Sequence, residues 1–200
     1  YLLPFYNTPF AQFVKTDVDF RYYVKTEDNN QIVWRIFAGV GLPYGNSNLL
    51  PFGEKYFVGG ASSIRAWQAR SLGPGQYAPP DDMIFFNQTG DIKLELNFEY
   101  RHNIIQFLEG AFFIDAGNIW TINSYDSRQG SIFFIDNFYK QIAVGTGYGI
   151  RANFNFFVVR LDLGVKVIEP NALKGERFIL MNRDYRLDDF VINFAIGYPF

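Results

Sequence analysis

The feature that most constrains this chain is an alternation of apolar and polar residues that recurs in seven segments. These segments cover positions 14–24, 32–42, 92–101, 108–115, 142–151, 159–167 and 190–198, and in the third of them the chain reads IKLELNFEYR. Side chains of an extended strand point to opposite faces in turn, so a period of two predicts strands with two unlike faces. The chain is therefore predicted to be all-β.

Segment length and the character of the polar face favour a membrane barrel over a soluble antiparallel sandwich. A strand needs about ten residues to cross a bilayer at a tilt, whereas strands of soluble proteins more often have about five or six. The polar positions carry charges of both signs, as a water-filled or salt-bridged lumen would: Asp17, Asp19, Arg21, Arg35, Glu95, Glu99, Asp115, Arg151, Arg160 and Asp162. We predict an antiparallel transmembrane β-barrel.

Composition supports this prediction and excludes several other classes. Aromatic residues make up 20% of the 200 residues, which excludes a disordered chain. The absence of cysteine excludes zinc ribbons, disulfide scaffolds and thiol nucleophiles. A net charge of −2 gives no footprint for nucleic acid. Mean hydropathy is only −0.05, because outward aromatic residues and inward charges average out.

The connections between the segments alternate between short and long. Short turns are predicted at residues 27–30, 102–105 and 152–155, and long connections at 43–87, 121–139 and 169–188. Outer-membrane barrels have short periplasmic turns and long extracellular loops, and bacterial single-chain barrels have an even number of strands. Because residues 1–10 contain two prolines and resemble the tail of a loop, we expect seven strands cut from a longer barrel.

The connection at 43–87 is too long for a structureless link and is expected to be functional. Its centre, residues 50–75, reads LPFGEKYFVGGASSIRAWQARSLGPG. This stretch resembles the sixth extracellular loop of the Omp85 superfamily of outer-membrane assembly and translocation proteins. The shared pattern is, in order, an aromatic residue, a Gly-Gly pair, Ser, Ile-Arg, a second aromatic residue and Gly-Pro. The residues that carry the resemblance are Gly59, Gly60, Ser63, Ile64, Arg65 and Trp67. Ala66 departs from the family, which most often has Gly there, and Ala disfavours a positive φ.

Further matches extend the resemblance over essentially the whole chain. The FIDAGN stretch, with Phe113, Asp115 and Gly117, resembles the family's aromatic-x-Asp-x-Gly motif, and Glu99 matches a recurrent inward glutamate. The C-terminal segment resembles the signal by which assembly machinery recognises outer-membrane substrates, through Phe194, Ile196, Gly197, Tyr198 and Phe200. The resemblance implies the last seven of sixteen strands, with residues 43–87 as an extracellular loop folded into the lumen.

The resemblance also implies a location and a task. The location is the outer membrane of a Gram-negative-type cell, crossed several times. The task is to insert or translocate other β-barrel proteins by lateral opening, with residues 190–200 as the working edge. The implied partners are outer-membrane lipid, unfolded β-barrel substrates, and periplasmic or lipoprotein accessory subunits recruited through N-terminal repeats that this chain lacks. No cofactor, metal or nucleic acid is implied.

A loop folded into a lumen needs an anchor, and Arg65 is the candidate. A guanidinium offers five donors in a fixed fork, and the alternation places Glu99 and Asp115 on the inward face. We therefore expect Arg65 to pair with one of these carboxylates. The alternative is an ordinary surface cation, whose ion pair would contribute about 0–1 kcal/mol.

Other functions receive less support from the residues. The only histidine, His102, falls in a predicted turn without a nucleophile nearby, so we expect no enzyme. Asp17 and Asp19 are flanked by Lys15 and Arg21, which indicates charge pairing. The alternative functions are a passive porin-like channel and a two-partner-secretion-type transporter. A diffusion pore has no reason to carry the loop motif.

Overall fold

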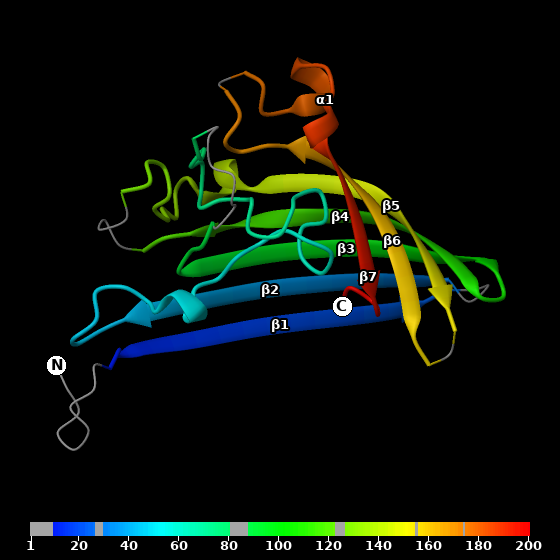
Figure 1. Ribbon diagram of the computed structural model, residues 1–200, viewed down its shortest axis with the longest axis horizontal. Coiled ribbons are helices and arrows are strands. Elements are labelled where there is room, and N and C mark those ends of the chain that lie inside the picture. The colour runs from blue at the N-terminus through cyan, green and yellow to red at the C-terminus, as the bar shows by residue number, and fades with distance from the viewer. Residues whose placement is uncertain (1–9, 27–29, 81–87, 123–126, 155, 174) are drawn as a thin grey trace.

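The computed structural model of the chain describes residues 10–26, 30–80, 88–122, 127–154, 156–173 and 175–200. Its seven strands form one antiparallel sheet in chain order (Figure 1). They are β1 (Phe13–Lys25), β2 (Gln31–Pro43), β3 (Ile92–Ile105), β4 (Leu108–Trp120), β5 (Ala143–Asn153), β6 (Val158–Ile168) and β7 (Phe190–Ile196). The prediction of an all-β antiparallel fold is confirmed.

Short helical turns occur only within the long connections of the described chain. They are η2 (Phe52–Glu54), η3 (Phe138–Gln141), α1 (Ile179–Asn182) and η4 (Leu187–Asp189). In the part of the chain that the structure describes, no helix has the length and apolar character to cross a membrane.

The two faces of the sheet differ as the alternation predicts. On the outer face, large apolar side chains are exposed, among them Phe20, Trp34, Leu96, Phe112 and Leu161. On the inner face, charged side chains are buried: Arg35, Glu95, Glu99, Asp115, Arg151, Arg160 and Asp162. The charged residues Asp17, Asp19 and Arg21 of β1 remain exposed.

The strand ends differ from the prediction in two places. The turn predicted at residues 102–105 was wrong, because β3 continues to Ile105 and pairs with β4 through His102 and Asn103. The side chains of His102 and Asn103 point to opposite faces of the strand, as those of the preceding residues do. The His102 ring stacks on the outer side with Tyr100 and Phe112. At the other end of the chain, β7 stops at Ile196, before the predicted end at Tyr198.

Some predictions fall on residues outside the described chain. These are residues 1–9, residues 27–29 and 155 in two of the predicted turns, residues 81–87 at the end of the long loop, and residues 123–126 and 174 in the other two long connections. The described part of that loop, together with residues 88–91, connects β2 to β3.

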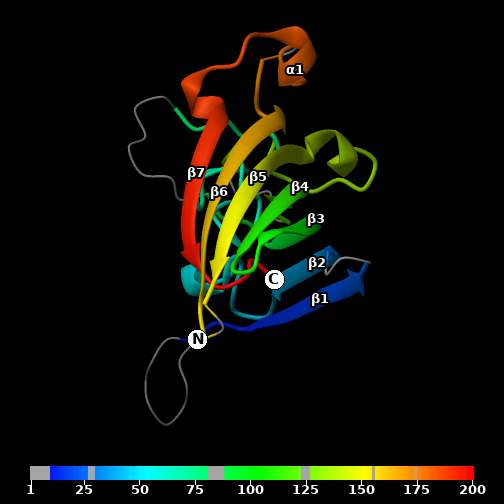
Figure 2. The same cartoon turned by 90° about the vertical axis from the view of Figure 1, so that its right-hand side faces the viewer.

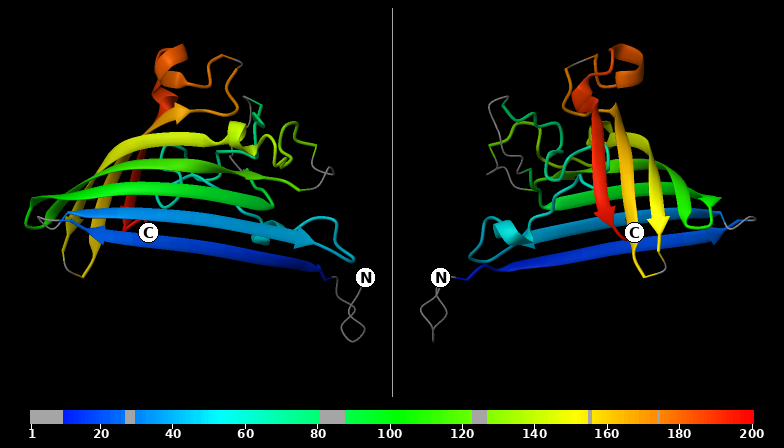
Figure 3. Two further views of the ribbon diagram at one scale, coloured as in Figure 1. Left: turned by 180° about the vertical axis from the view of Figure 1, so that it is seen from behind. Right: turned by 45° about the vertical axis from the view of Figure 1, so that its right-hand side comes forward.

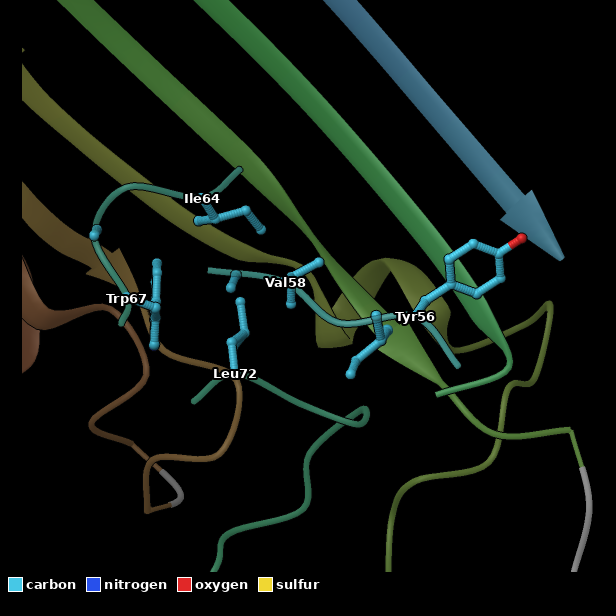
Figure 4. Packing of buried hydrophobic residues seen from close by; sticks show 8 residues of the cluster. Tyr56, Val58, Ile64, Trp67 and Leu72 are labelled. Carbon is cyan, nitrogen blue, oxygen red and sulfur yellow. The ribbon is translucent and has the colours of Figure 1, made fainter. Parts of the chain in front are cut away.

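The hydrophobic core lies between this loop and the concave face of the sheet. The strands form an arc with the loop inside it (Figure 2), and the arrangement is also visible from behind (Figure 3). Loop residues Tyr56, Val58, Ile64, Ala66, Trp67 and Leu72 cluster with Ile119 of β4 and Ala143 of β5 (Figure 4). The loop thus serves as the second layer that the inner face of the sheet packs against.

Candidate functional site

The loop motif forms a compact turn because two glycines adopt conformations that other residues avoid. Gly59 and Gly60 have φ angles of +96° and +88°, a region in which a Cβ is unfavourable. A Cβ at Gly59 would also lie 3.0 Å from the carbonyl carbon of Gln68. The Gly60 N–H donates to the Trp67 carbonyl at 2.7 Å, which closes the turn. Arg65 is thereby presented toward the inner wall.

Arg65 is bound by Asp115 of β4 through three hydrogen bonds. Its Nε and Nη2 donate to the two carboxylate oxygens at 2.8 and 2.9 Å, and its backbone N–H donates to Oδ2 at 3.0 Å. Parallel guanidinium–carboxylate bonds are strong and orient both groups. Arg65 and Asp115 are both fully buried, so the pair lies in the interior between loop and sheet.

Glu99 of β3 accepts hydrogen bonds from three arginines. Arg65 Nη1 donates to it at 2.6 Å, Arg151 of β5 donates twice at 2.6 and 2.8 Å, and Arg101 Nε donates at 2.5 Å. The structure therefore brings Arg65 to both inner-wall carboxylates that the alternation placed on this face. Burial alone would lower the pKa of the Arg65 guanidinium, but the charge and hydrogen bonds of Asp115 outweigh it, so the pKa is raised.

Two aromatic rings flank the Arg65 guanidinium. Its Cζ lies 3.6 Å from the centre of the Phe113 ring and 5.6 Å from that of Phe200. A cation in this position interacts favourably with the electrons of the ring face. Phe113 and Asp115, which alternate with Ile114 on β4, thus contact the same guanidinium from one strand.

Sequence reasoning did not name Asn97 of β3 as a site residue, although it connects loop and wall. Its Nδ2 donates to the Ser63 carbonyl at 3.0 Å and to Asp115 Oδ1 at 2.9 Å. The Ser63 hydroxyl donates to Glu95 and accepts from the Gly59 N–H, the latter at 3.0 Å. The signal that points to Asn97 is its position in the alternation between Glu95 and Glu99.

The strand glycines allow the loop backbone to lie directly on the sheet. A Cβ at Gly164 of β6 would lie 2.7 Å from the Arg65 carbonyl carbon, and a Cβ at Gly145 of β5 would collide with the Cβ of Ala66. At Gly117 an added Cβ would lie 3.2 Å from Ile64 Cδ1. The Arg65 carbonyl also accepts a hydrogen bond from Asn193 Nδ2 of β7 at 2.8 Å.

Ala66, where the family most often has Gly, fits without a positive φ. The only non-glycine residue with a positive φ in the described chain is Arg70. The methyl group of Ala66 occupies the space above Gly145 of β5. The absence of a side chain at Gly145 therefore makes room for Ala at position 66 of the loop.

The C-terminal signal residues divide between the two faces. Phe194 and Ile196 are exposed on the outer face of β7. Gly197, with a φ of +89°, bends the chain, and its N–H donates to the Val158 carbonyl at 2.7 Å. Beyond the bend, the Tyr198 hydroxyl donates to Glu109, and Phe200 is buried on the inner side near Arg65. Residues 198–200 therefore do not extend the strand edge that the resemblance implied.

The remaining candidates have ordinary partners. Asp19 pairs with Arg21 at 2.8 Å and with Arg35 at 3.0 Å, and Asp17 accepts a hydrogen bond from the Tyr56 hydroxyl. His102 Nε2 lies 3.3 Å from the Tyr148 hydroxyl. Within the described ranges, no three His, Asp or Glu side chains are grouped so that they could hold a metal ion.

Comparison with known proteins identifies the family. A family model described as the Omp85 superfamily domain matches residues 7–200. The outer membrane protein assembly factor BamA of Neisseria meningitidis serogroup B is 28% identical over 97 residues, which are 47% of this chain and 12% of that protein. The chain therefore spans only a small part of this relative.

Two solved structures share the fold at low sequence identity. BamA from Haemophilus ducreyi lacking POTRA domains 1–3 superposes with a TM-score of 0.63 and 15% identity, over 97% of this chain and 35% of that chain. CdiB from Acinetobacter baumannii superposes with a TM-score of 0.52 and 18% identity, over 93% and 27%. With its family model, its barrel-like sheet and its apolar outer face, this chain belongs to the Omp85 superfamily and is an outer-membrane protein that crosses the membrane with several β-strands.

Proposed function

We propose that this chain forms part of an outer-membrane barrel that inserts or translocates other β-barrel proteins. The relative named above is an assembly factor, which supports this task. In the proposal, residues 43–87 form an extracellular loop folded into the lumen, and further strands and periplasmic repeats precede the chain. Unfolded β-barrel proteins are the substrates, and accessory subunits bind the repeats.

The observation that carries the proposal is that the edge strand β7 is short and pairs with β6 over few residues. It pairs with β6 over seven residue pairs, whereas β1 and β2 pair over thirteen. After Ile196 the chain leaves the sheet at Gly197 and turns inward. An edge strand presents unpaired N–H and C=O groups on which another strand can be added. The proposed seam therefore opens at β7, and an incoming strand pairs with residues 190–196.

The proposed action is mechanical, and the Arg65 anchor supports it. A loop held over the inner face by Asp115 and Glu99 obstructs the space inside the sheet, which suits a plugged barrel better than a diffusion pore. The proposal includes no catalytic residue and no cofactor. A passive porin would instead show large and steady open-state currents in a planar bilayer, whereas small and irregular currents are expected here.

The decisive experiment is a disulfide across the proposed seam of the full-length protein. One cysteine replaces a residue of β7 and the other a facing residue of the barrel's first strand, and this chain contributes no background cysteine. Oxidation should abolish insertion of a reporter barrel protein into vesicles, and reduction should restore it.

A matched control ties β7 to its existing neighbour. Leu163 of β6 and Ile192 of β7 face each other in the register, so Leu163→Cys with Ile192→Cys adds a disulfide without closing the seam. This variant should remain active after oxidation. Full activity of the seam-closed protein would rule out lateral opening at β7.

A further inference from the structure

An apolar groove lies on the outer face of β5 and β6, at the end of the sheet where the long connections lie. It has a volume of about 450 Å³ and is lined by Ile142, Val144, Ile168, Phe178 and Tyr139, with Lys140 and Arg177 at its border. Val144 and Ile168 belong to the membrane-crossing strands, so the groove faces the bilayer.

Both walls of this outer groove are held to the sheet. On one side, Phe178 forms a bridge with Ile168, and the Glu169 N–H donates to the Arg177 carbonyl at 2.9 Å. On the other side, Gln141 at the end of η3 accepts a hydrogen bond from Trp120 Nε1 at 2.6 Å. The groove is thus a formed feature of the fold.

A second apolar groove meets the first at Ile142. It has a volume of about 390 Å³ and is lined mainly by residues of β2, β3 and β4, including the outward Ile36, Leu94, Leu96 and Ala116, and also by Phe138. The small side chain of Ala116 leaves a depression between larger neighbours. The two grooves together offer separate channels for more than one acyl chain.

The two cations at the border have no carboxylate partner among the described residues. Lys140 Nζ makes a weak hydrogen bond to Asn137 Oδ1 at 3.4 Å, and it lies 5.5 Å from the centre of the Tyr139 ring. The Nε of Arg177 is buried without a hydrogen-bond partner in the described chain. By contrast, Arg183 of the same connection is paired with Asp189 at 2.7 Å.

We propose that the paired grooves bind a phospholipid with a net negative charge. The phosphate lies between Lys140 and Arg177, and the acyl chains follow the apolar channels on either side of Ile142. Basic groups near a membrane surface attract anionic lipid by about 1 kcal/mol each, or roughly a factor of five in affinity. Apolar channels below such a phosphate site match the two ends of a lipid. The proposal rests on the membrane location and is independent of the insertion activity.

The test is lipid titration of the purified full-length protein in nonionic detergent, followed by native mass spectrometry. The probes are phosphatidylglycerol and phosphatidylcholine with identical acyl chains. Wild type should retain phosphatidylglycerol more tightly. The double variant Lys140→Gln with Arg177→Gln should lose about 25-fold in phosphatidylglycerol affinity, that is, about fivefold per charge, with little change for phosphatidylcholine.

Three further variants separate charge, shape and fold. Arg186→Gln removes an exposed cation of the same connection that does not line the groove, and this variant should bind as wild type. Lys140→Arg with Arg177→Lys keeps both charges and should retain the lipid, which shows that loss in the Gln variant is not misfolding. Val144→Trp fills the groove below the intact cations and should weaken binding.

Three results would overturn the proposal. One is equal retention of the two lipids by wild type, and another is unchanged binding by the double Gln variant. The third is displacement of the lipid by glycerol phosphate at the same concentration, because a site for the anion alone would not need the grooves.

Discussion

Arg65 and Asp115 join the long loop to the inner wall through both side chain and backbone. The carboxylate accepts from Nε at 2.8 Å, from Nη2 at 2.9 Å and from the Arg65 backbone N–H at 3.0 Å. One aspartate therefore fixes the direction of the guanidinium and the position of the loop backbone at once. A lysine at position 65 would supply a charge without this planar fork.

Removal of Arg65 should release the loop from the sheet. Arg65→Ala leaves Asp115 buried without its cation and Glu99 with fewer donors, and breaking a buried pair in this way costs about 3–5 kcal/mol. We expect faster protease cleavage within residues 50–75 and a lower urea midpoint for unfolding. Arg70→Ala is the control, because Arg70 lies in the same loop but stacks on Phe57 at 4.6 Å. Equal effects of the two substitutions would contradict an anchoring role for Arg65.

Asn97 should matter less than Arg65 but more than a polar residue at the end of its strand. Asn97→Leu removes the donor to the Ser63 carbonyl and to Asp115 Oδ1, and a buried acceptor left unsatisfied costs about 1–3 kcal/mol. Urea unfolding of the variant measures this loss. Asn103→Leu, at the exposed end of β3, should change stability by less than about 0.5 kcal/mol. A neutral effect of Asn97→Leu would show that water replaces the amide.

The strand pattern was predictable because it depends only on residues that are close together in the sequence. Successive residues of each strand face lipid and the interior in turn, so spacing alone predicts that Phe98 faces outward and Glu99 inward. Pairing of Arg65 with either Glu99 or Asp115 was expected from the loop motif and from the shared face of the two carboxylates, whereas its contact with both was not.

The remaining features depend on contacts between distant residues. The sequence alone does not show that the Arg65 carbonyl lies on Gly164, because the path of the loop follows from its packing against β4, β5 and β6. The polar run of His102 and Asn103 indicated a turn locally, but pairing with Gly110 and Glu109 keeps both residues in β3. The inward course of Phe200 likewise depends on the bend at Gly197 and on the cations that meet its ring.

Acid should loosen the connection between β6 and β7. Burial raises the pKa of the Asp189 carboxyl, but hydrogen bonds from Arg183 and the Arg186 N–H outweigh it and hold the pKa below its usual value. The fold therefore favours the ionised form. The stabilisation is complete above the ordinary aspartate pKa of about 3.9 and is lost as the pH falls through the lowered value.

A spin label on Leu187→Cys measures this loosening, because Leu187 is 94% exposed and the chain has no other cysteine. Label mobility should be low near neutral pH and rise below about pH 4. With Asp189→Asn added, mobility should be high throughout and nearly independent of pH. A pH-dependent rise of the same size in the Asn variant would assign the change to another group.

Ala66 and Gly145 should behave as a complementary pair across the loop and β5. A Cβ at position 145 would collide with the Cβ of Ala66, while its next neighbour, Trp67 Cζ3, lies 3.3 Å away. Gly145→Ala should therefore destabilise the protein by about 1–3 kcal/mol through overpacking, and Ala66→Gly should recover most of this loss in the double variant. Gly147→Ala is the control, because its Cβ would meet the Leu163 carbonyl and Phe113 instead, and Ala66→Gly should not rescue it. Additive effects of the Gly145 and Ala66 substitutions in urea unfolding would contradict direct contact, because residues in contact show coupling energies of about 0.5–3 kcal/mol.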